Sequence, residues 1–391
     1  MKILVVSQYY YPEPFRITDI CETLVKKGHE VTVVTGIPNY PMGRIYDGYR
    51  GRDKRHEVIN GVKVYRCFTI GRRTGALWRF LNYYSFSLSS TAFLSKHKEE
   101  YDVVFVNQLS PVIMSNGAIR YKKKHGKKMV LYCLDLWPAS LLVGGIKENS
   151  LLYRYFYKVS KRIYEKADKI LITSKSFAKY FEEKFGIVGT EYLPQYAEEL
   201  FTMENCKKRP SETVDLMFAG NVGAAQAVDT IVRAAALTKD VEKMRWHIVG
   251  DGSELEACKR LAMELNVTSV IFHGRQPLEK MPEYYSMADA MLVTMNKDTV
   301  AEMTLPGKVQ TYMAAGKPII GAIDGEAARV ISESNSGLCC GAEDFAGLAE
   351  AARHFACNIS NADKHAENSY AYYVNMFEKN KVLLEFERQL Q

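Results

Sequence analysis

Short apolar runs alternate with longer amphipathic stretches along almost the whole chain, and this alternation is what most constrains the fold. The apolar runs, each short enough for one strand, span Ile3–Ser7, Val31–Thr35, Val62–Cys67, Val103–Asn107, Met129–Cys133, Ile170–Thr173, Val214–Ala219, Trp246–Val249, Ser269–His273, Ala290–Thr294, Pro318–Gly321 and Gly337–Cys340. Helical patterns lie between them, for example over Ile17–Lys27, Pro111–Lys124, Leu151–Ala167 and Ser176–Phe185. Continuous apolar strands separated by helices are typical of parallel sheets covered on both faces.

A polar segment near Ala197–Ser211 interrupts the alternation, which restarts at Val214. The chain of 391 residues suits two domains of ordinary size. We predict an α/β protein of two doubly wound, Rossmann-like domains, over residues 1–203 and 204–370, with a helix over residues 371–391 that packs back on the first domain. Two such domains facing one another leave a central cleft at the carboxyl ends of their strands, where ligands bind.

Charge and composition limit the classes of partner. The net charge is +7, and the basic residues concentrate in the first half. Anionic lipid head groups, a pyrophosphate-bearing substrate or an ordinary solvated surface each explain this asymmetry. Nucleic acid is not expected, because no nucleic-acid-binding module accompanies the charge. No run of about 18 apolar residues is present, so we predict no membrane span.

The N-terminus and the cysteines indicate a cytoplasmic protein. Met1–Ser7 enters directly into a strand and lacks a cleavable signal pattern. The 8 cysteines show no C-x-x-C spacing. This pattern favours reduced thiols over a zinc site or a disulfide framework.

Three successive strands of the second half end in glycine. Gly220 and Gly223 follow the first strand, Gly250 follows the second, and Gly274 follows the third and precedes Arg275. Glycine turns at one sheet edge let backbone N–H groups approach a ligand, although a single such turn is equally common as a structural junction.

A cation stands at the start of a helix in the same half. Lys308 lies in the first turn behind Pro306-Gly307, where free backbone N–H groups favour an anion. Gly316 and Lys317-Pro318 end this helix before the next strand. Further on, Glu326 begins another helix, where it either caps the helix or orients sugar hydroxyls.

The order of these motifs resembles the donor-binding half of retaining GT-B glycosyltransferases. It is most similar to family-4 enzymes that build bacterial surface polysaccharides, including an N-acetyl-L-fucosamine transferase subgroup. The motifs that carry the resemblance are Gly250-Asp251-Gly252-Ser253, Pro306-Gly307-Lys308-Val309, Tyr312-Met313-Ala314-Ala315-Gly316-Lys317-Pro318, Asp324-Gly325-Glu326-Ala327, Lys26-Lys27-Gly28-His29-Glu30-Val31, Gly36-Ile37-Pro38-Asn39-Tyr40-Pro41 and Leu134-Asp135-Leu136-Trp137-Pro138.

The chain also departs from the wider family at positions that hold the donor phosphates. Phe15-Arg16 stands in place of the family's Gly-Gly, Asn221 and Gln226 in place of its arginine and lysine, and Met303 and Thr311 in place of its two glutamates, with Glu302 adjacent. A diphosphate in a cleft needs neutralising cations, so we expect Arg16, Arg275 and above all Lys308 to supply them. The predicted donor-binding residues are Arg16, Gly220, Asn221, Gly223, Gly250, Gly274, Arg275, Lys308, Thr311 and Glu326.

The resemblance implies transfer from a UDP-sugar, an N-acetylated hexosamine, with retention at the anomeric carbon and no covalent carboxylate nucleophile. No Asp-x-Asp stands at a strand edge, so we expect no metal and no other cofactor. We expect Asp135, Lys308 and Arg275 to be catalytic. Asp135 follows an apolar strand, where it acts as a base, contacts the donor sugar or merely caps the turn. Asn39 and Asn107 end strands and bind acceptor hydroxyls unless turn chemistry alone explains them.

The subgroup implies a lipid-pyrophosphate-linked saccharide as acceptor, in capsule, O-antigen or exopolysaccharide synthesis. The segment Arg72–Lys98 mixes aromatic and aliphatic residues with flanking cations, which fits a helix in a membrane interface or an ordinary core helix. We therefore expect a peripheral protein on the inner face of the bacterial plasma membrane. Two alternatives stay open: a nucleotide-sugar 2-epimerase of the same architecture, and a catalytically degenerate partner in a polysaccharide assembly complex.

Overall fold

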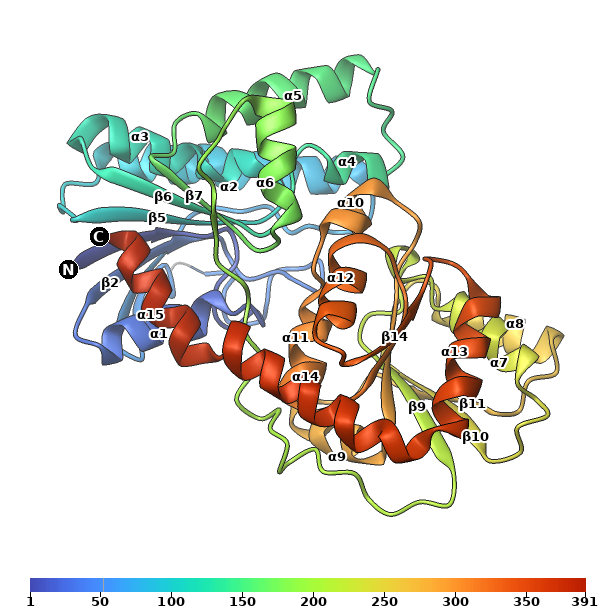
Figure 1. The fold of residues 1–391 in the computed structure, drawn as a ribbon. Coiled ribbons are helices and arrows are strands. Elements are labelled where there is room, and N and C mark those ends of the chain that lie inside the picture. The colour runs from blue at the N-terminus through green and yellow to red at the C-terminus, as the bar shows by residue number, and fades with distance from the viewer. Residues whose placement is uncertain (52) are drawn as a thin grey trace. The chain divides into compact units, whose positions relative to one another are not determined.

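The computed structural model describes residues 1–51 and 53–391, and these residues form two compact units (Figure 1). The first unit comprises Met1–Thr173, Phe177–Leu193 and Leu383–Gln391. The second comprises Ser174–Ser176 and Pro194–Val382. Each unit contains its own sheet, so the predicted class of two Rossmann-like α/β domains is confirmed.

The sheet of the first unit has the strand order β3-β4-β2-β1-β5-β6-β7-β8, and only β3 runs antiparallel to its neighbour. Its strands are β1 (Lys2–Val6), β2 (Glu30–Thr35), β3 (His56–Ile59), β4 (Val62–Arg66), β5 (Val103–Gln108), β6 (Lys128–Cys133), β7 (Lys169–Ile172) and β8 (Glu191–Tyr192). The chain order reverses between β1 and β5. Loops after these two strands therefore flank a topological switch point, where such sheets bind ligands.

Helices cover both faces of this sheet (Figure 1). One face carries α2, α3 and α5, and the other carries α1 and α15. The helices of the first unit are α1 (Ile17–Lys26), α2 (Ala76–Lys96), α3 (Asn116–His125), α4 (Ser140–Val143), α5 (Leu151–Tyr164), α6 (Ser176–Tyr180) and α15 (Lys379–Leu390), with a 3-10 turn at Val112–Ser115 and a π-helical turn at Phe181–Phe185. The central strands are buried on both faces, which explains their unbroken apolar sequences.

The second unit has a fully parallel sheet of order β11-β10-β9-β12-β13-β14. Its strands are β9 (Val214–Ala219), β10 (Met244–Val249), β11 (Val270–Gly274), β12 (Ala290–Thr294), β13 (Ile319–Ala322) and β14 (Gly337–Cys340). This is the dinucleotide-binding strand order, with its switch point between β9 and β12.

Two apolar cores lie on opposite faces of the second sheet. One joins the sheet to α7 (Asp229–Leu237), α8 (Leu255–Glu264) and α13 (Phe345–Cys357). The other contains residues of α9 (Met281–Met287), α11 (Gly307–Ala314) and α12 (Gly325–Glu333). The remaining helices of this unit are α10 (Thr299–Met303) and α14 (Ala362–Met376), with 3-10 turns at Ala224–Gln226, Leu278–Lys280 and Ile359–Asn361.

The predicted strands are all present, with ends within two residues of those expected. The chain enters the second unit at Pro194, earlier than the predicted boundary at residue 204. The reason is that Ala197, Phe201 and Cys206 of the polar segment are buried in the second unit's core. The segment is polar overall, so its sequence did not indicate that three of its apolar residues belong to the core of the second unit.

The C-terminal segment expected as one helix over residues 371–391 is two. Helix α14 ends at Met376, and Glu378 caps α15 by accepting hydrogen bonds from the backbone N–H groups of Asn380 and Lys381 at 2.9 Å each. Only Leu383–Gln391 joins the first unit. There the Phe386 ring meets the Phe105 ring edge-on, with centroids 4.7 Å apart.

We predict that Phe386→Ala destabilises the first unit by about 3 kcal/mol, because it removes a ring that is only 1% exposed and leaves a cavity against β5. Urea denaturation followed by circular dichroism measures the loss. Leu384→Ala is the matched control, since Leu384 lies on the same helix and is 48% exposed. Equal losses for both variants would contradict the packing role of α15.

Candidate functional site

The three glycine turns of the second unit meet at the carboxyl edge of its sheet. The N–H of Gly220 donates to the carbonyl of Val249 at 2.9 Å, and the N–H of Gly250 donates to the carbonyl of Gly274 at 2.9 Å. Gly220 and Gly250 have φ angles of +145° and +150°, which side chains rarely permit. A Cβ added to Gly250 would lie 1.8 Å from the Gly220 carbonyl oxygen. The turns therefore depend on glycine to approach one another.

Beside these turns lies the ammonium of Lys308. Helix α11 begins at Gly307, so Lys308 projects from its first turn. Its Nζ lies 3.8 Å from the centroid of the Phe218 ring and 3.3 Å from the position that a Cβ on Gly220 would occupy. The Nζ atom is buried and has no hydrogen-bond partner in the described part of the chain.

Burial lowers the pKa of Lys308 to about 7, because a low-dielectric environment disfavours the charged form. Phe218 offers only the weak attraction of a ring face. A buried cation without a carboxylate partner is costly unless an anion joins it. The N-terminus of α11 favours an anion at the same place.

Asn221 and Gly223 lie in the first glycine turn, where the Asn221 side-chain amide donates to Oε1 of Gln226 at 3.1 Å. Asn221 and Gln226 stand where the wider family has an arginine and a lysine, and here the two side-chain amides hydrogen-bond to each other. Thr311 lies one turn after Lys308, and its hydroxyl donates to the carbonyl of Gly307 at 3.1 Å. That Thr311 and Asn221 bind the donor stays a prediction.

Glu326 is 3% exposed at the first turn of α12, and its carboxylate is already engaged. It accepts hydrogen bonds from the Ser176 hydroxyl at 2.7 Å and from Nη2 of Arg329 at 2.7 Å. The structure thus gives this carboxylate partners within the protein, and a contact with sugar hydroxyls stays a prediction. Arg275 is exposed, and its side chain forms no hydrogen bond or ion pair with any residue that the structure describes, Lys308 included.

Four of the candidate residues belong to the first unit. Asp135 follows β6, and its Oδ2 accepts a hydrogen bond from the N–H of Ser110 at 3.1 Å. Burial raises the pKa of Asp135, while the Ser110 hydrogen bonds and the charge of Arg72 oppose the rise. A carboxyl group with a raised pKa at a strand end is suited to accept a proton. Arg16 precedes α1 and lies near enough to lower the pKa of Tyr132 against the larger effect of burial.

Asn39 and Asn107 are buried, at 1% and 3% exposure, and form hydrogen bonds inside the first unit. The Asn39 Oδ1 accepts from the N–H of Arg72 at 3.1 Å and from the amide of Asn82 at 3.2 Å. The Asn107 amide donates to the Ser7 hydroxyl at 3.2 Å. Both side chains therefore hold loops in place, and direct acceptor contacts stay a prediction.

Sequence reasoning missed Glu13, which ties two loops at this edge together. Its carboxylate accepts hydrogen bonds from the backbone N–H groups of Asn39 at 2.8 Å and Tyr40 at 2.7 Å. Burial raises the pKa of Glu13 to about 7, against the opposing effect of these hydrogen bonds. The available signal was an acidic residue between Pro12 and Pro14, in the loop that follows the first buried strand.

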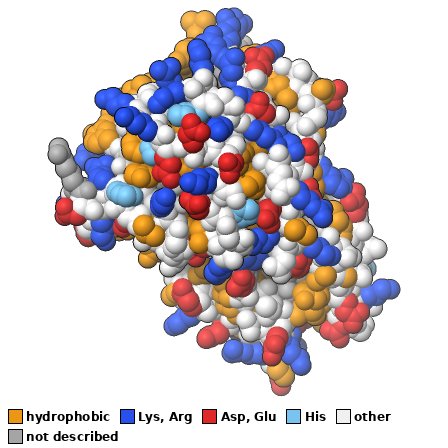
Figure 2. Space-filling model, turned by 90° about the vertical axis from the view of Figure 1, so that its left-hand side faces the viewer, with side chains coloured by type: hydrophobic (Ala, Val, Ile, Leu, Met, Phe, Trp, Pro, Cys, Tyr) orange, Lys and Arg blue, Asp and Glu red, His pale blue; other side chains and the backbone are white. Residues whose placement is uncertain are grey.

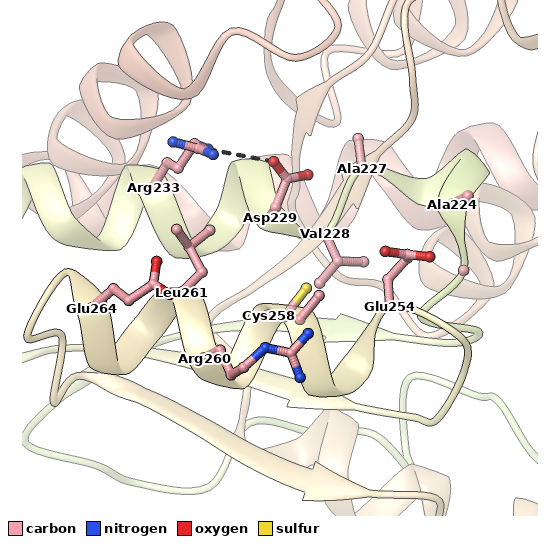
Figure 3. Close-up of a pocket in the computed structure, with 12 residues that line it drawn as sticks. Ala224, Ala227, Val228, Asp229, Arg233, Glu254, Cys258, Arg260, Leu261 and Glu264 are labelled. Atoms are coloured by element: carbon pink, nitrogen blue, oxygen red, sulfur yellow. Dashed lines mark hydrogen bonds and ion pairs between the residues drawn. The ribbon is translucent and has the colours of Figure 1, made fainter.

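A polar pocket of about 470 Å³ lies between α7 and α8 (Figure 3). Its wall includes the ion pair of Arg233 with Asp229, whose atoms are 3.4 Å apart. The pocket shares only Gly223 with the predicted donor site. It therefore adjoins the first glycine turn without containing Lys308.

Within the described residues, no group of three or more His, Cys, Asp and Glu side chains is arranged to hold a metal ion. Whether the reaction uses a metal is a separate question, and its independence of metal stays a prediction.

A family model matches most of each unit. Residues 15–193 match the glycosyl transferase 4-like domain, and residues 213–358 match glycosyl transferases group 1. The two matches together identify the chain as a glycosyltransferase, with a 4-like domain followed by a group 1 domain. The resemblance expected from the sequence is thus confirmed at the level of this group and of the GT-B fold, while the retaining mechanism and the fucosamine subgroup stay predictions.

Two curated proteins are similar to this glycosyltransferase. The probable glycosyltransferase WbjE of Pseudomonas aeruginosa is 28% identical over 251 residues, which cover 61% of this chain and 62% of that protein. The alignment thus spans less than two thirds of the Pseudomonas protein. WcaI of Escherichia coli strain K12, a glycosyl transferase named for colanic acid biosynthesis, is 24% identical over 99% of this chain and 98% of its own length.

Solved structures share the fold of this glycosyltransferase. Sucrose-phosphate synthase of Thermosynechococcus elongatus superposes with a TM-score of 0.77 at 17% identity, covering 99% of this chain and 97% of that one. Anabaena HepE, solved in complex with UDP and glucose, superposes with a TM-score of 0.71 at 14% identity, covering 100% of this chain and 99% of that one. At these identities the likeness concerns the fold alone.

We predict that Gly250→Ala disrupts the carboxyl edge of the second sheet, because a methyl group there collides with the Gly220 carbonyl in a backbone region closed to alanine. The expected result is a loss of about 2 kcal/mol or more, measured as a lowered melting temperature. Gly341→Ala is the control, since its Cβ meets nothing closer than 3.7 Å. If Gly250→Ala were as stable as the control, the backbone of the turns could shift to admit a side chain, and the close approach would not require glycine.

Proposed function

We propose that this glycosyltransferase moves a sugar from a UDP-sugar to a lipid-pyrophosphate-linked saccharide, with retention of configuration at the anomeric carbon. The donor sugar is an N-acetylated hexosamine, and the product enters bacterial capsule, O-antigen or exopolysaccharide. The observation that carries the proposal is the buried, unpartnered ammonium of Lys308 beside the Gly220 turn. The naming of WcaI for colanic acid biosynthesis and the UDP complex of HepE support the substrate class.

In this proposal Lys308 neutralises the diphosphate of the donor. The N-terminal N–H groups of α11 and the backbone of the glycine turns add hydrogen bonds that strengthen as negative charge develops on the leaving UDP. Gly220, Gly250 and Gly274 leave room for the phosphates, and Arg275 and Arg16 add positive charge. These groups do the work that a metal does in other transferases, so we propose a metal-independent reaction without a cofactor.

The acceptor hydroxyl then attacks the anomeric carbon on the same face from which UDP leaves. Asp135 receives the proton of that hydroxyl or positions it. Its raised pKa supports the first role, because a carboxylate that binds a proton more tightly is a stronger base.

The arrangement of the histidines favours a transferase over a 2-epimerase. An epimerase needs acids and bases that converge on the sugar, yet His247 hydrogen-bonds to His273 at 2.9 Å and to Asp215 at 3.0 Å. His247 is 3% exposed and Asp215 is 6% exposed, so this chain of groups lies in the interior of the second unit. The degenerate-partner alternative predicts no binding of UDP.

We further propose that the first unit docks on the inner face of the bacterial plasma membrane through α2 and α5. In the described residues no helix is long and apolar enough to cross a membrane. On α2, Leu77 is 66% exposed and Phe80 is 45% exposed, and on α5, Leu151 is 83% exposed. Tyr84 of α2 lies near Tyr155 of α5, whose phenol adds to the rise that burial causes in the pKa of Tyr84. The opposite face of α2 is buried, so the helix serves both the core and this surface.

Cations near this surface suit anionic lipids, since Arg79, Arg154 and Lys158 are exposed on the same two helices. Figure 2 shows Lys and Arg side chains across one face of the molecule with Asp and Glu side chains among them. In the lysine-rich pocket of about 520 Å³ at residues 122–128, Lys122 pairs with Asp168 at 2.6 Å. The lysine-rich pocket is therefore the weaker candidate for lipid binding.

We predict that UDP binds the wild-type protein and that Lys308→Ala weakens this binding by about 3 kcal/mol, or a hundredfold. The free ammonium has a pKa of about 7, and contact with a diphosphate raises it. Above pH 7 binding therefore takes up a proton, so UDP affinity falls by up to about tenfold per pH unit between about pH 7 and pH 9. Isothermal titration calorimetry in buffers of different ionisation enthalpy measures both effects.

Lys239→Ala, at an exposed lysine of the same unit, is the control and should bind UDP as the wild type does. UDP affinity that is the same in Lys308→Ala and wild type, or no UDP binding at all, would refute the donor site. A panel of UDP-sugars, scored by thermal stabilisation and then by UDP release with a lipid-linked acceptor, identifies the donor.

We also predict that the double variant Leu77→Asp/Leu151→Asp binds anionic phospholipid vesicles at least about tenfold more weakly than the wild type, because two exposed leucines no longer enter the interface. Co-sedimentation with vesicles measures the change. Met263→Asp is the matched control, since Met263 is 76% exposed on the second unit. Unchanged sedimentation of the double variant would rule out this surface.

A further inference from the structure

Arg72 of the first unit is a half-buried cation framed by tyrosines. Its Cζ lies 5.8 Å from the ring centroid of Tyr40 and 5.8 Å from that of Tyr83. Tyr9 is a third neighbour, whose phenol interacts electrostatically with the guanidinium. Burial lowers the pKa of Arg72, but the phenols of Tyr83, Tyr9 and Tyr40 outweigh it and raise the pKa above its usual range.

No carboxylate of the described residues forms an ion pair with Arg72, in contrast to Arg66 and Arg329. Arg66 pairs with Glu57 at 2.6 Å, and Arg329 pairs with Glu326 at 2.7 Å and with Glu333 at 2.6 Å. A guanidinium removed from water is stabilised by an anion that it contacts through two N–H groups. Around Arg72 the protein supplies phenols in place of that anion.

Buried amides hold Arg72 in this position. Asn82 of α2 is fully buried, and its Nδ2 donates to the carbonyl of Ile70 at 2.6 Å and to Oδ1 of Asn39 at 3.2 Å. The same Oδ1 accepts the backbone N–H of Arg72. The Gln8 amide donates to Oδ1 of Asn82 at 2.8 Å. The loops after β1 and β2 and the segment before α2 are thus joined, so the guanidinium is preorganised.

The surroundings of Arg72 are those expected of a substrate site. Tyr9 follows β1 and Tyr40 follows β2, so both lie at the carboxyl edge of the first sheet. Their rings pack with Phe15 in a cluster whose centroids are 5.1 to 5.6 Å apart. The charge of Arg72 also reaches Asp135, whose pKa it lowers in part against the dominant effect of burial. Arg72 and the proposed base therefore influence one another electrostatically.

We propose that Arg72, together with the phenols of Tyr40 and Tyr83, binds an oxyanion of the acceptor. The oxyanion is a phosphate of the lipid-linked diphosphate or a carboxylate of an acidic sugar in the saccharide. Bidentate contact with the guanidinium and hydrogen bonds from the phenols fix the acceptor next to Asp135. This inference rests on the proposed function in one respect, that the acceptor binds the first unit.

Binding of two soluble probes, geranyl diphosphate and glucuronic acid, tests the subsite by ligand-observed NMR titration. Saturating UDP occupies the site at Lys308, so that geranyl diphosphate cannot bind there. The titration is repeated without UDP in the Lys308→Ala variant, which lacks that ammonium. We expect at least one probe to bind, and Arg72→Gln to weaken that binding at least about tenfold. Arg72→Lys keeps the charge but loses the bidentate geometry, so its affinity for the probe should lie between those of the wild type and Arg72→Gln.

The matched control is Arg120→Gln, which removes an exposed arginine from α3 and should leave probe binding unchanged. A diphosphate that depends on Arg72 identifies the lipid phosphate, and a glucuronic acid that depends on it identifies a sugar carboxylate. Equal probe affinity for wild type and Arg72→Gln, or no binding of either probe to wild type, would overturn the subsite. UDP affinity, measured separately on the same proteins, tells this failure from failure of the donor site.

Discussion

Parallel strand pairing is the constraint on which the rest of this structure depends. In each unit it sends every loop that follows a strand to one edge of the sheet, however far apart those loops are in sequence. In the second unit this brings the turns at Gly220, Gly250 and Gly274 into hydrogen-bonding contact. In the first unit it brings Tyr9, Tyr40 and Asp135, which follow β1, β2 and β6, to one edge of the sheet. The candidate site residues thus lie together at the sheet edges, although they belong to loops and not to the apolar strands.

The two units handle buried positive charge in a similar way. Lys308 lies over one aromatic ring and Arg72 lies near two, and neither has a carboxylate partner in the described residues. Aromatic rings hold a cation weakly and leave its strongest interaction unsatisfied. Most other partly buried cations in the chain, such as Arg66 and Lys208, contact carboxylates. The two candidate sites thus share a cation that lies against aromatic rings and lacks a carboxylate partner.

The sequence predicted the strands and the Lys308 region well because their signals are local. A glycine after an apolar run, or a lysine after Pro-Gly at a helix start, is read within a few residues. Arg72 and Glu13 could not be found this way, since their partners come from loops that only folding brings together. Strand β3 was missed because its residues are alternately exposed and half-buried, without an apolar run. Asn39 and Asn107 were found at strand ends, but their internal hydrogen bonds depend on Asn82 and Ser7, which lie far away in sequence.

The last residues of the chain complete the unit that the first residues begin. During synthesis, β5 and its Phe105 emerge from the ribosome long before Phe386 does, and the entire second unit is made in between. Until α15 arrives, one apolar site on the first sheet stays uncovered, while the second unit already has all of its strands. The second unit can therefore reach its native packing before the first, the reverse of the order in which most multidomain chains fold.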